Sequence, residues 1–132
     1  MIGYYAHHHG AGHLSRAAAV ARCLDEPVTL LSSAAVSKSP VFVDSVELAD
    51  DAPGKASYDD ITAHGQLHWA PYHHRGLQRR MSQVARWVEF ARPSVVVVDV
   101  SVEVTNLVRL LGVPVVVVAM PGNRADPAHQ WG

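Results

Sequence analysis

The chain has 132 residues, with 11 lysines and arginines against 12 aspartates and glutamates and a formal net charge of −1. This length is typical of one domain with a hydrophobic core. The near-neutral net charge gives no sign of the basic surface that binds nucleic acid. A single cysteine rules out an internal disulfide framework, and no apolar run approaches the roughly 20 residues that span a bilayer, so we expect a soluble, cytoplasmic protein.

The N-terminal segment predicts a strand, a glycine-rich turn and a helix. Residues 2–5 (IGYY) are rich in strand formers, residues 7–13 (HHHGAGH) follow, and apolar residues then recur at helical spacing over residues 14–24. Gly10 and Gly12 permit backbone dihedrals closed to other residues and let a ligand approach the main chain. Because the first N–H groups of a helix have no partner within it, this turn favours an anion such as a phosphate or a carboxylate.

Two further strands precede a long loop. Residues 25–27 (DEP) end the helical pattern and residues 28–31 (VTLL) form a second strand, which completes a βαβ unit with parallel strands. Residues 41–48 (VFVDSVEL) alternate well enough for a third, shorter strand. Residues 50–74 carry four histidines and no clear period, so we expect a long loop, which in a compact domain is usually functional, disordered or misassigned.

The helical period returns from Gly76 to Ala91. One face is apolar and contains Leu77, Met81, Val84, Val88 and Ala91. The other face contains Arg75, Arg79, Gln83 and Arg86. We interpret this polar face as solvated in preference to an anion site, and Pro93 ends the helix.

The last part of the chain predicts two buried strands around a short helix. Residues 95–98 (VVVV) form a strand that finishes in Asp99, and residues 113–119 form another. Ser101 can cap a helix that runs to Leu111 and stops at Gly112. Its inward side chains are Val104, Leu107, Val108 and Leu111. Continuous valine runs indicate strands covered on both faces, so we expect an α/β fold with a Rossmann-like, doubly wound, mainly parallel sheet of about five or more strands flanked by helices.

The predicted topology places candidate chemistry at one point. In a sheet of strand order 3-2-1-4-5 the switch point lies between the first and fourth strands, and ligands bind beyond their carboxyl ends. The loops there are residues 7–13 and residues 99–101. They bring together His13 as a general base and Asp99 as the acid that fixes its tautomer and charge. The alternatives are that His13 caps the turn and that Asp99 caps the following helix.

Other residue groups suggest sites that we favour less. Strand alternation sends His7 and His9 to one side and His8 to the other, so this run makes a poor zinc site and we expect no metal. The loop histidines, of which some could line an acceptor cleft, are His64, His68, His73 and His74.

A dinucleotide-binding fingerprint is incomplete in two places. Gly10 and Gly12 supply two of its glycines, but the third position is Ser15. The second strand ends in Ser32 and Ser33, where a ribose-binding acid would be expected.

Two segments resemble a known family. HHHGAGHLSRAAAVARCL followed by VTLLSS resembles the opening of GT-B glycosyltransferases, particularly the MurG-like group, in which a glycine-rich turn ending in His precedes the first helix. RPSVVVVDVSVEVTNLVRLLGVPVVVVAMPG resembles the later part of the same N-terminal domain. The similarity covers both ends of the chain and skips the middle loop.

The resemblance implies that residues 1–132 are the acceptor-binding domain of a two-domain transferase, whose donor-binding domain is missing from this chain. His13 then matches the catalytic base and Asp99 the aspartate that pairs with it. The residues expected to contact substrate are His9, Gly10, Gly12, Ser101, Pro121 and Gly122. No cofactor or metal is expected, because helix N-termini and side chains can offset the charge of the leaving diphosphate.

The same resemblance implies the partners. The donor is a nucleotide sugar, held by the missing domain, and the acceptor is a small molecule, a lipid-linked molecule or a natural product. We expect a cytoplasmic protein and leave open a peripheral position at the inner membrane face and a homo-oligomer. We do not expect this chain alone to catalyse the transfer of a sugar.

Two rival hypotheses remain. The first is a non-catalytic subunit or binding module that docks a separate donor domain. The second is a nucleotide-binding domain of another α/β enzyme.

Overall fold

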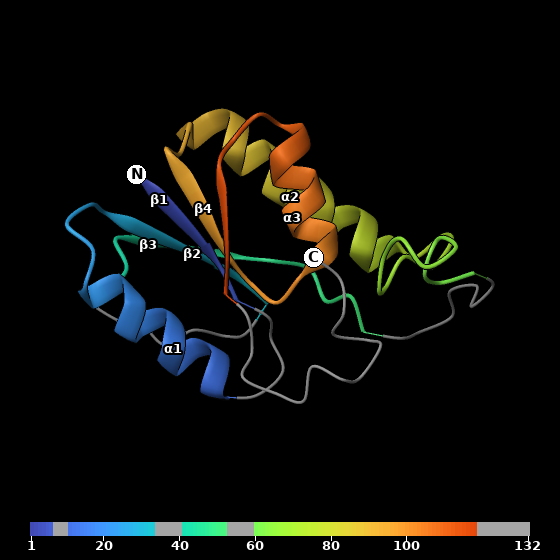
Figure 1. Cartoon of the computed structure of the whole chain (residues 1–132), viewed down its shortest axis with the longest axis horizontal. Helices are drawn as coiled ribbons and strands as arrows, with labels where there is room; N and C mark the ends of the chain where they lie inside the picture. The colour runs from blue at the N-terminus through green and yellow to red at the C-terminus, as the bar shows by residue number, and fades with distance from the viewer. Residues whose placement is uncertain (7–10, 34–40, 53–59, 119–132) are drawn as a thin grey trace.

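The chain folds into a parallel sheet with helices on both of its faces (Figure 1). The computed structural model describes residues 1–6, 11–33, 41–52 and 60–118. In chain order its elements are β1 (Ile2–Tyr5), α1 (Ala11–Arg22), β2 (Val28–Ser32), β3 (Asp44–Glu47), α2 (Arg75–Ala91), β4 (Val95–Asp99), α3 (Val102–Leu110) and β5 (Val115–Val118).

The strand order is β3-β2-β1-β4-β5, and every neighbouring pair is parallel. This confirms the expected α/β class and the order 3-2-1-4-5. Strand β1 lies at the centre, where Tyr5 is in register with Leu31 of β2 and with Val98 of β4. The switch point therefore lies between β1 and β4, as the doubly wound topology requires.

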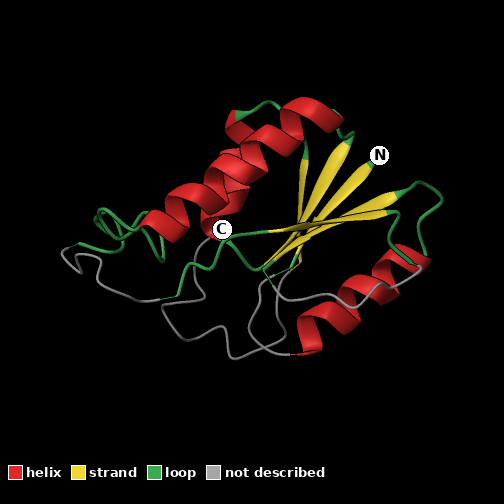
Figure 2. Cartoon of the chain, turned by 180° about the vertical axis from the view of Figure 1, so that it is seen from behind, coloured by secondary structure: helices red, strands yellow, loops and turns green. Residues whose placement is uncertain are grey.

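Helix α1 covers one face of the sheet, while α2 and α3 cover the other (Figure 2). Successive strand side chains point to opposite faces, so Tyr4 packs on the α1 side and Tyr5 on the α2 and α3 side. A Cβ on Gly3 would lie 2.7 Å from the ring of Trp87, so glycine is what lets α2 pack directly on β1.

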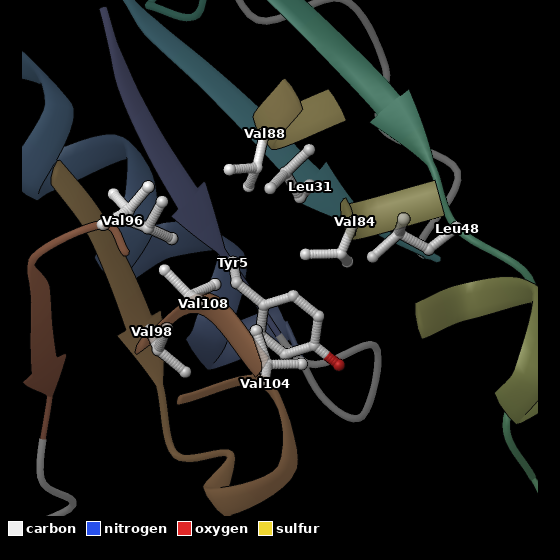
Figure 3. Packing of buried hydrophobic residues seen from close by; sticks show 10 residues of the cluster. Tyr5, Leu31, Leu48, Val84, Val88, Val96, Val98, Val104 and Val108 are labelled. Atoms are coloured by element: carbon white, nitrogen blue, oxygen red, sulfur yellow. The ribbon is translucent and has the colours of Figure 1, made fainter. Parts of the chain in front are cut away.

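Buried side chains fill both layers. The cluster between the sheet and α2 and α3 contains Tyr5, Leu31, Leu48, Val84, Val88, Val96, Val98, Val104, Val108 and Val113 (Figure 3). The cluster under α1 contains Ile2, Tyr4, Ala6, Ala17, Ala21, Val28, Leu30 and Val97. Each fully buried valine or leucine contributes about 1.5–3 kcal/mol, so both faces hold the fold together.

Three expectations about local structure are wrong. Helix α1 begins at Ala11, so Gly12 and His13 lie in its first turn. Gly12 therefore has a helical conformation and not the backbone dihedrals closed to other residues that the turn was expected to need. Strand β5 is not buried, because it is the last strand of the described sheet and its Val116 and Val117 are 53% and 41% exposed. Leu111 does not face inward, since it is 42% exposed at the end of α3.

The polar side of α2 is less solvated than predicted. Gln83 is half-buried, and its side chain accepts a hydrogen bond from Ala49 N at 2.8 Å and donates one to the carbonyl of Glu47 at 3.1 Å. These bonds join the helix to the end of β3. Arg75, Arg79 and Arg86 are exposed, as expected.

Among the described residues, no helix combines the length and the apolar character needed to cross a membrane.

Candidate functional site

The candidate site lies at the carboxyl edge of the sheet, where β1 and β4 end side by side. Chain direction and strand alternation place different residues on its two sides. One cluster faces α1 and consists of Tyr4, Arg16 and Asp99, which we call the α1-side cluster. The other faces α2 and consists of Tyr5, Arg80 and Asp51, which we call the α2-side cluster.

In the α1-side cluster a buried carboxylate meets an arginine from the first helix. Val97 and Asp99 point from β4 toward α1, and the Asp99 side chain is fully buried. Arg16 Nη1 donates a hydrogen bond to Asp99 Oδ1 at 3.3 Å, and the Arg16 side chain is 29% exposed. The buried acid therefore has a cation at the rim of the site, which offsets part of the cost of removing its charge from water.

Tyr4 completes this cluster. Burial, and after it the negative charge of Asp99, raise the pKa of Tyr4 to about 12. A side-chain hydrogen bond with Asp99 makes the smallest of the contributions to this shift in pKa. Tyr4 is therefore a neutral phenol at physiological pH and is unsuited to act as a base there.

The predicted base lies on the same side. His13 is in the first turn of α1, three residues before Arg16, and residues at this spacing share a helix face. The structure describes the backbone of His13 but not its side chain, so the expected pair with Asp99 stays a prediction. The expected substrate contacts His9, Gly10, Pro121 and Gly122 lie outside the described residues.

Ser101 has a structural role in the described chain. Its hydroxyl accepts a hydrogen bond from Val104 N at 3.2 Å and so caps α3, as predicted from the sequence. Between Asp99 and Ser101, Val100 has φ of 50°, a left-handed conformation that is strained for a β-branched residue. This sharp junction ends β4 and lets α3 begin two residues later, at Val102.

A cavity of about 310 Å³ opens on the other side of the sheet edge. Its lining consists of Tyr5, Asp51, Ala52, His68, Trp69, Leu77, Met81, Val100, Ser101, Val102 and Glu103. Segments far apart in sequence meet here: the end of β1, the chain after β3, the loop before α2, and the start of α3. Described parts of the long loop of residues 50–74 therefore form one wall of the cavity, and whether this loop is functional stays a prediction.

Trp69 is held in that wall by two hydrogen bonds. Its backbone N–H donates to Glu103 Oε1, and its indole Nε1 donates to the carbonyl of Asp51 at 2.8 Å. The indole and the Glu103 carboxylate are therefore fixed before any ligand arrives, which lowers the entropy cost of binding.

His74 anchors the loop where it enters α2. Its Nδ1 accepts from Leu77 N at 3.0 Å, so the ring proton is on Nε2, which donates to the carbonyl of Ala52 at 2.7 Å. A Cβ on Gly76 would lie 1.9 Å from the carbonyl oxygen of Asp50, so only glycine lets the chain after β3 pass this close to the helix. His68 lines the cavity, whereas His64 is 91% exposed.

Two members of the α2-side cluster, Tyr5 and Asp51, line the cavity, and the third, Arg80, lies behind them. The side chain of Arg80 is fully buried, and its Nε donates to the Tyr5 hydroxyl at 2.7 Å. Its Nη1 donates to Ser33 Oγ and to the carbonyl of Ala49, each at 3.0 Å, and Asp51 Oδ2 lies 3.9 Å from Nε. A buried guanidinium with these partners ties β1, β2 and the chain after β3 to α2.

Sequence reasoning missed Arg16, Arg80, Trp69 and Glu103. For Arg80 a signal was present, because it is three residues after Leu77 and four before Val84, on the apolar stripe of α2. The described residues contain no group of three or more His, Cys, Asp or Glu side chains arranged to hold a metal ion.

Comparison with known proteins identifies no relative of the chain. No family model matches the chain, and neither the curated proteins nor the solved structures contain a match.

Proposed function

We propose that the chain is the acceptor-binding domain of a GT-B-type glycosyltransferase, with a nucleotide sugar as donor. In this proposal, His13 takes the proton of an acceptor hydroxyl as that oxygen attacks the anomeric carbon of the donor. The bond from this carbon to the diphosphate breaks, and the nucleoside diphosphate leaves with the electron pair. The donor would be held by a second domain.

The observation that carries the proposal is the meeting of α1 and Asp99 beside the switch point. The strand order brings β1 and β4 together, and Asp99 points from the end of β4 toward the helix whose first turn contains His13. This is the place where α/β sheets of this topology bind ligands. An Asp hydrogen bond to the His13 ring would set its tautomer and stabilise the imidazolium that proton transfer forms.

Arg16 supplies the remaining electrostatic element. Its side chain is 29% exposed, so it can reach a negative group of a ligand while it contacts Asp99. A cation beside the start of a helix favours a phosphate or diphosphate. The proposal therefore assigns Arg16 to the leaving diphosphate and Asp99 to the base.

One observation favours a second candidate, a non-catalytic binding module that docks a separate donor domain. The Asp99 carboxylate is paired with Arg16, and the cavity opens on the opposite side of the sheet edge. In such a module Asp99 and Arg16 would only hold α1 on the sheet. The two candidates differ in what a substitution at His13 does.

The first prediction concerns His13→Ala in the protein produced from its complete coding sequence. If His13 is the base, kcat falls by about 10²–10⁴-fold while the KM for the donor changes little. The measurement is release of nucleoside diphosphate from a panel of nucleotide sugars, with and without hydroxyl acceptors.

The matched control is His64→Ala, since His64 is 91% exposed and pairs with Asp60 outside the site. It should keep wild-type kcat. Full activity in His13→Ala would contradict the base assignment, and a wild-type protein that neither binds nor consumes any nucleotide sugar would favour the binding module.

A further inference from the structure

A groove lies between the C-terminal ends of α2 and α3, at the edge of the sheet opposite to the candidate site. The two helices lie side by side and run antiparallel to the strands, so they end where β4 and β5 begin (Figure 1). The groove has a volume of about 470 Å³. The apolar residues of its described lining are Ala85, Val88, Pro93, Leu111 and Val113.

Leu110 adds an exposed apolar side chain at the end of α3. It is the last residue of the helix and is 84% exposed, and the next residue, Leu111, is 42% exposed and lines the groove. Contiguous exposed apolar surface, unlike single scattered residues, marks a place where another molecule binds.

Two opposite charges complete the described lining of the groove. Glu89 in the last turn of α2 and Arg92 at its C-cap are both exposed, and residues three apart share a helix face. Within the part of the chain that the structure describes, neither forms an ion pair. The groove therefore offers a carboxylate and a guanidinium beside one apolar surface.

These features define what would cover the groove. The covering surface needs an apolar side chain, a cation opposite Glu89 and an anion opposite Arg92. The same surface of this chain carries all three, since Leu110 is apolar and the two charges have opposite sign. A two-fold axis between the two charges sets Glu89 of one copy against Arg92 of the other, and the reverse. The groove is therefore complementary to itself, as an isologous interface requires.

We propose that a second copy of this chain covers the groove in a two-fold dimer. Leu110 of each copy enters the groove of the other, and Glu89 of each copy pairs with Arg92 of the other. Burial of the apolar surface supplies most of the affinity, and the two symmetry-related ion pairs fix the register. Because the interface is small, we expect a dissociation constant on the order of 10–100 µM.

This interface is independent of the proposed transferase activity. It lies at the amino edge of the sheet and leaves open the carboxyl edge, where Asp99 and the first turn of α1 lie. Its test measures association alone, so failure of the transferase proposal would leave the dimer in place, and the reverse also holds.

The experiment is sedimentation equilibrium of the whole chain at pH 7, from micromolar to millimolar concentrations. We expect a reversible equilibrium between monomer and dimer. Glu89→Arg and Arg92→Glu, each made alone, place like charges in both ion pairs and should weaken association at least about tenfold. An equimolar mixture of these two variants regains two opposite-charge pairs, so it should form a heterodimer with about wild-type affinity. An effect of surface charge alone would not give this recovery.

A second variant tests the apolar contact. Leu110→Gln removes the side chain that enters the groove and should weaken association at least about tenfold. The matched controls are Val43→Gln, at a position that is 62% exposed, and Arg86→Glu, at an exposed position of α2. Both positions are outside the described lining of this groove, so both controls should associate like the wild type. All variants are checked for wild-type circular dichroism and melting temperature.

Four outcomes would overturn the proposal. The chain could stay monomeric up to millimolar concentration, or the single charge reversals could leave association unchanged in folded variants. The mixture of the two reversed variants could fail to associate. A monomer that binds vesicles of anionic phospholipid, and loses that binding in Leu110→Gln, would assign the groove to a membrane surface and not to a second copy.

Discussion

The two sides of the sheet edge carry the same three residue types with opposite burial. On the α1 side, Asp99 is fully buried and Arg16 is 29% exposed. On the α2 side, Arg80 is fully buried and Asp51 is 13% exposed. The consecutive residues Tyr4 and Tyr5 provide a buried phenol to each side.

Because of this difference in burial, the arginine of the α1-side cluster can exchange its protein partner for a ligand, whereas the arginine of the α2-side cluster cannot. A rim arginine can move toward a ligand anion with little loss, because it is already partly solvated. A buried arginine with hydrogen bonds from Nε and Nη1 cannot leave without exposing several unpaired groups. We therefore infer that the α1-side cluster is suited to contact a charged ligand and that the α2-side cluster supports the cavity wall.

The largest expected effect comes from Arg80→Ala. The substitution removes the donor to Tyr5, Ser33 and Ala49 and the cation that lies 3.9 Å from Asp51, so we expect about 3–5 kcal/mol less free energy of unfolding. Urea denaturation monitored by circular dichroism measures this.

Arg79→Ala is the matched control, since it changes the same residue type one position away on an exposed part of α2. It should alter the free energy of unfolding by no more than about 0.5 kcal/mol. A loss below about 1 kcal/mol for Arg80→Ala would mean that its bonds do not brace the sheet edge.

The next effect is a loss of stability in alkali. The pKa values of Tyr4 and Tyr5 are each about 12 in the folded chain against 10.0 for free tyrosine, so the unfolded chain loses its protons first. Stability is therefore complete below about pH 10 and falls as the pH rises toward 12, by up to about 1.4 kcal/mol per pH unit for each tyrosine.

Urea denaturation between about pH 9 and pH 11.5 checks this slope, and absorbance at 295 nm follows phenol ionisation. Tyr72 is 54% exposed, so Tyr72→Phe should leave the slope of stability against pH unchanged. Tyr4→Phe should remove the part of this slope that the ionisation of Tyr4 contributes. A free energy of unfolding that stays constant up to pH 11 would show that neither buried phenol resists ionisation.

Much of the fold follows from local sequence patterns. The valine run before Asp99 and the βαβ pattern of residues 2–32 define parallel strands, and the right-handed connection rule restricts their order. The run of residues 115–118 has the same composition as the buried run of β4, yet β5 is partly exposed. Apolar composition reports strand formation but not whether the strand lies at the centre or the edge of a sheet.

The candidate site was only partly predictable. Asp99 could be found because it ends a strand at the switch point, and Ser101 because it caps the helix that follows. Arg16 and Arg80 could not be assigned to their partners, which lie 83 and 75 residues away in the chain, because helical spacing shows which side a residue faces but not which residue it contacts. Trp69 and Glu103 come together only through the aperiodic loop.

The smallest effect is expected from removing single hydroxyl groups on the two sides. Tyr5→Phe takes the acceptor away from the buried Nε of Arg80 and should lower the free energy of unfolding by about 1–3 kcal/mol. The Tyr4 hydroxyl has only a weak hydrogen bond with Asp99, which is the smallest contribution to its raised pKa, so Tyr4→Phe should lower the free energy of unfolding by less than about 1 kcal/mol. Because both substitutions remove one oxygen from neighbouring buried tyrosines, differences in burial and side-chain entropy largely cancel. Urea denaturation of the two variants at pH 7 makes the comparison, and a larger loss for Tyr4→Phe would place the structural brace on the α1 side.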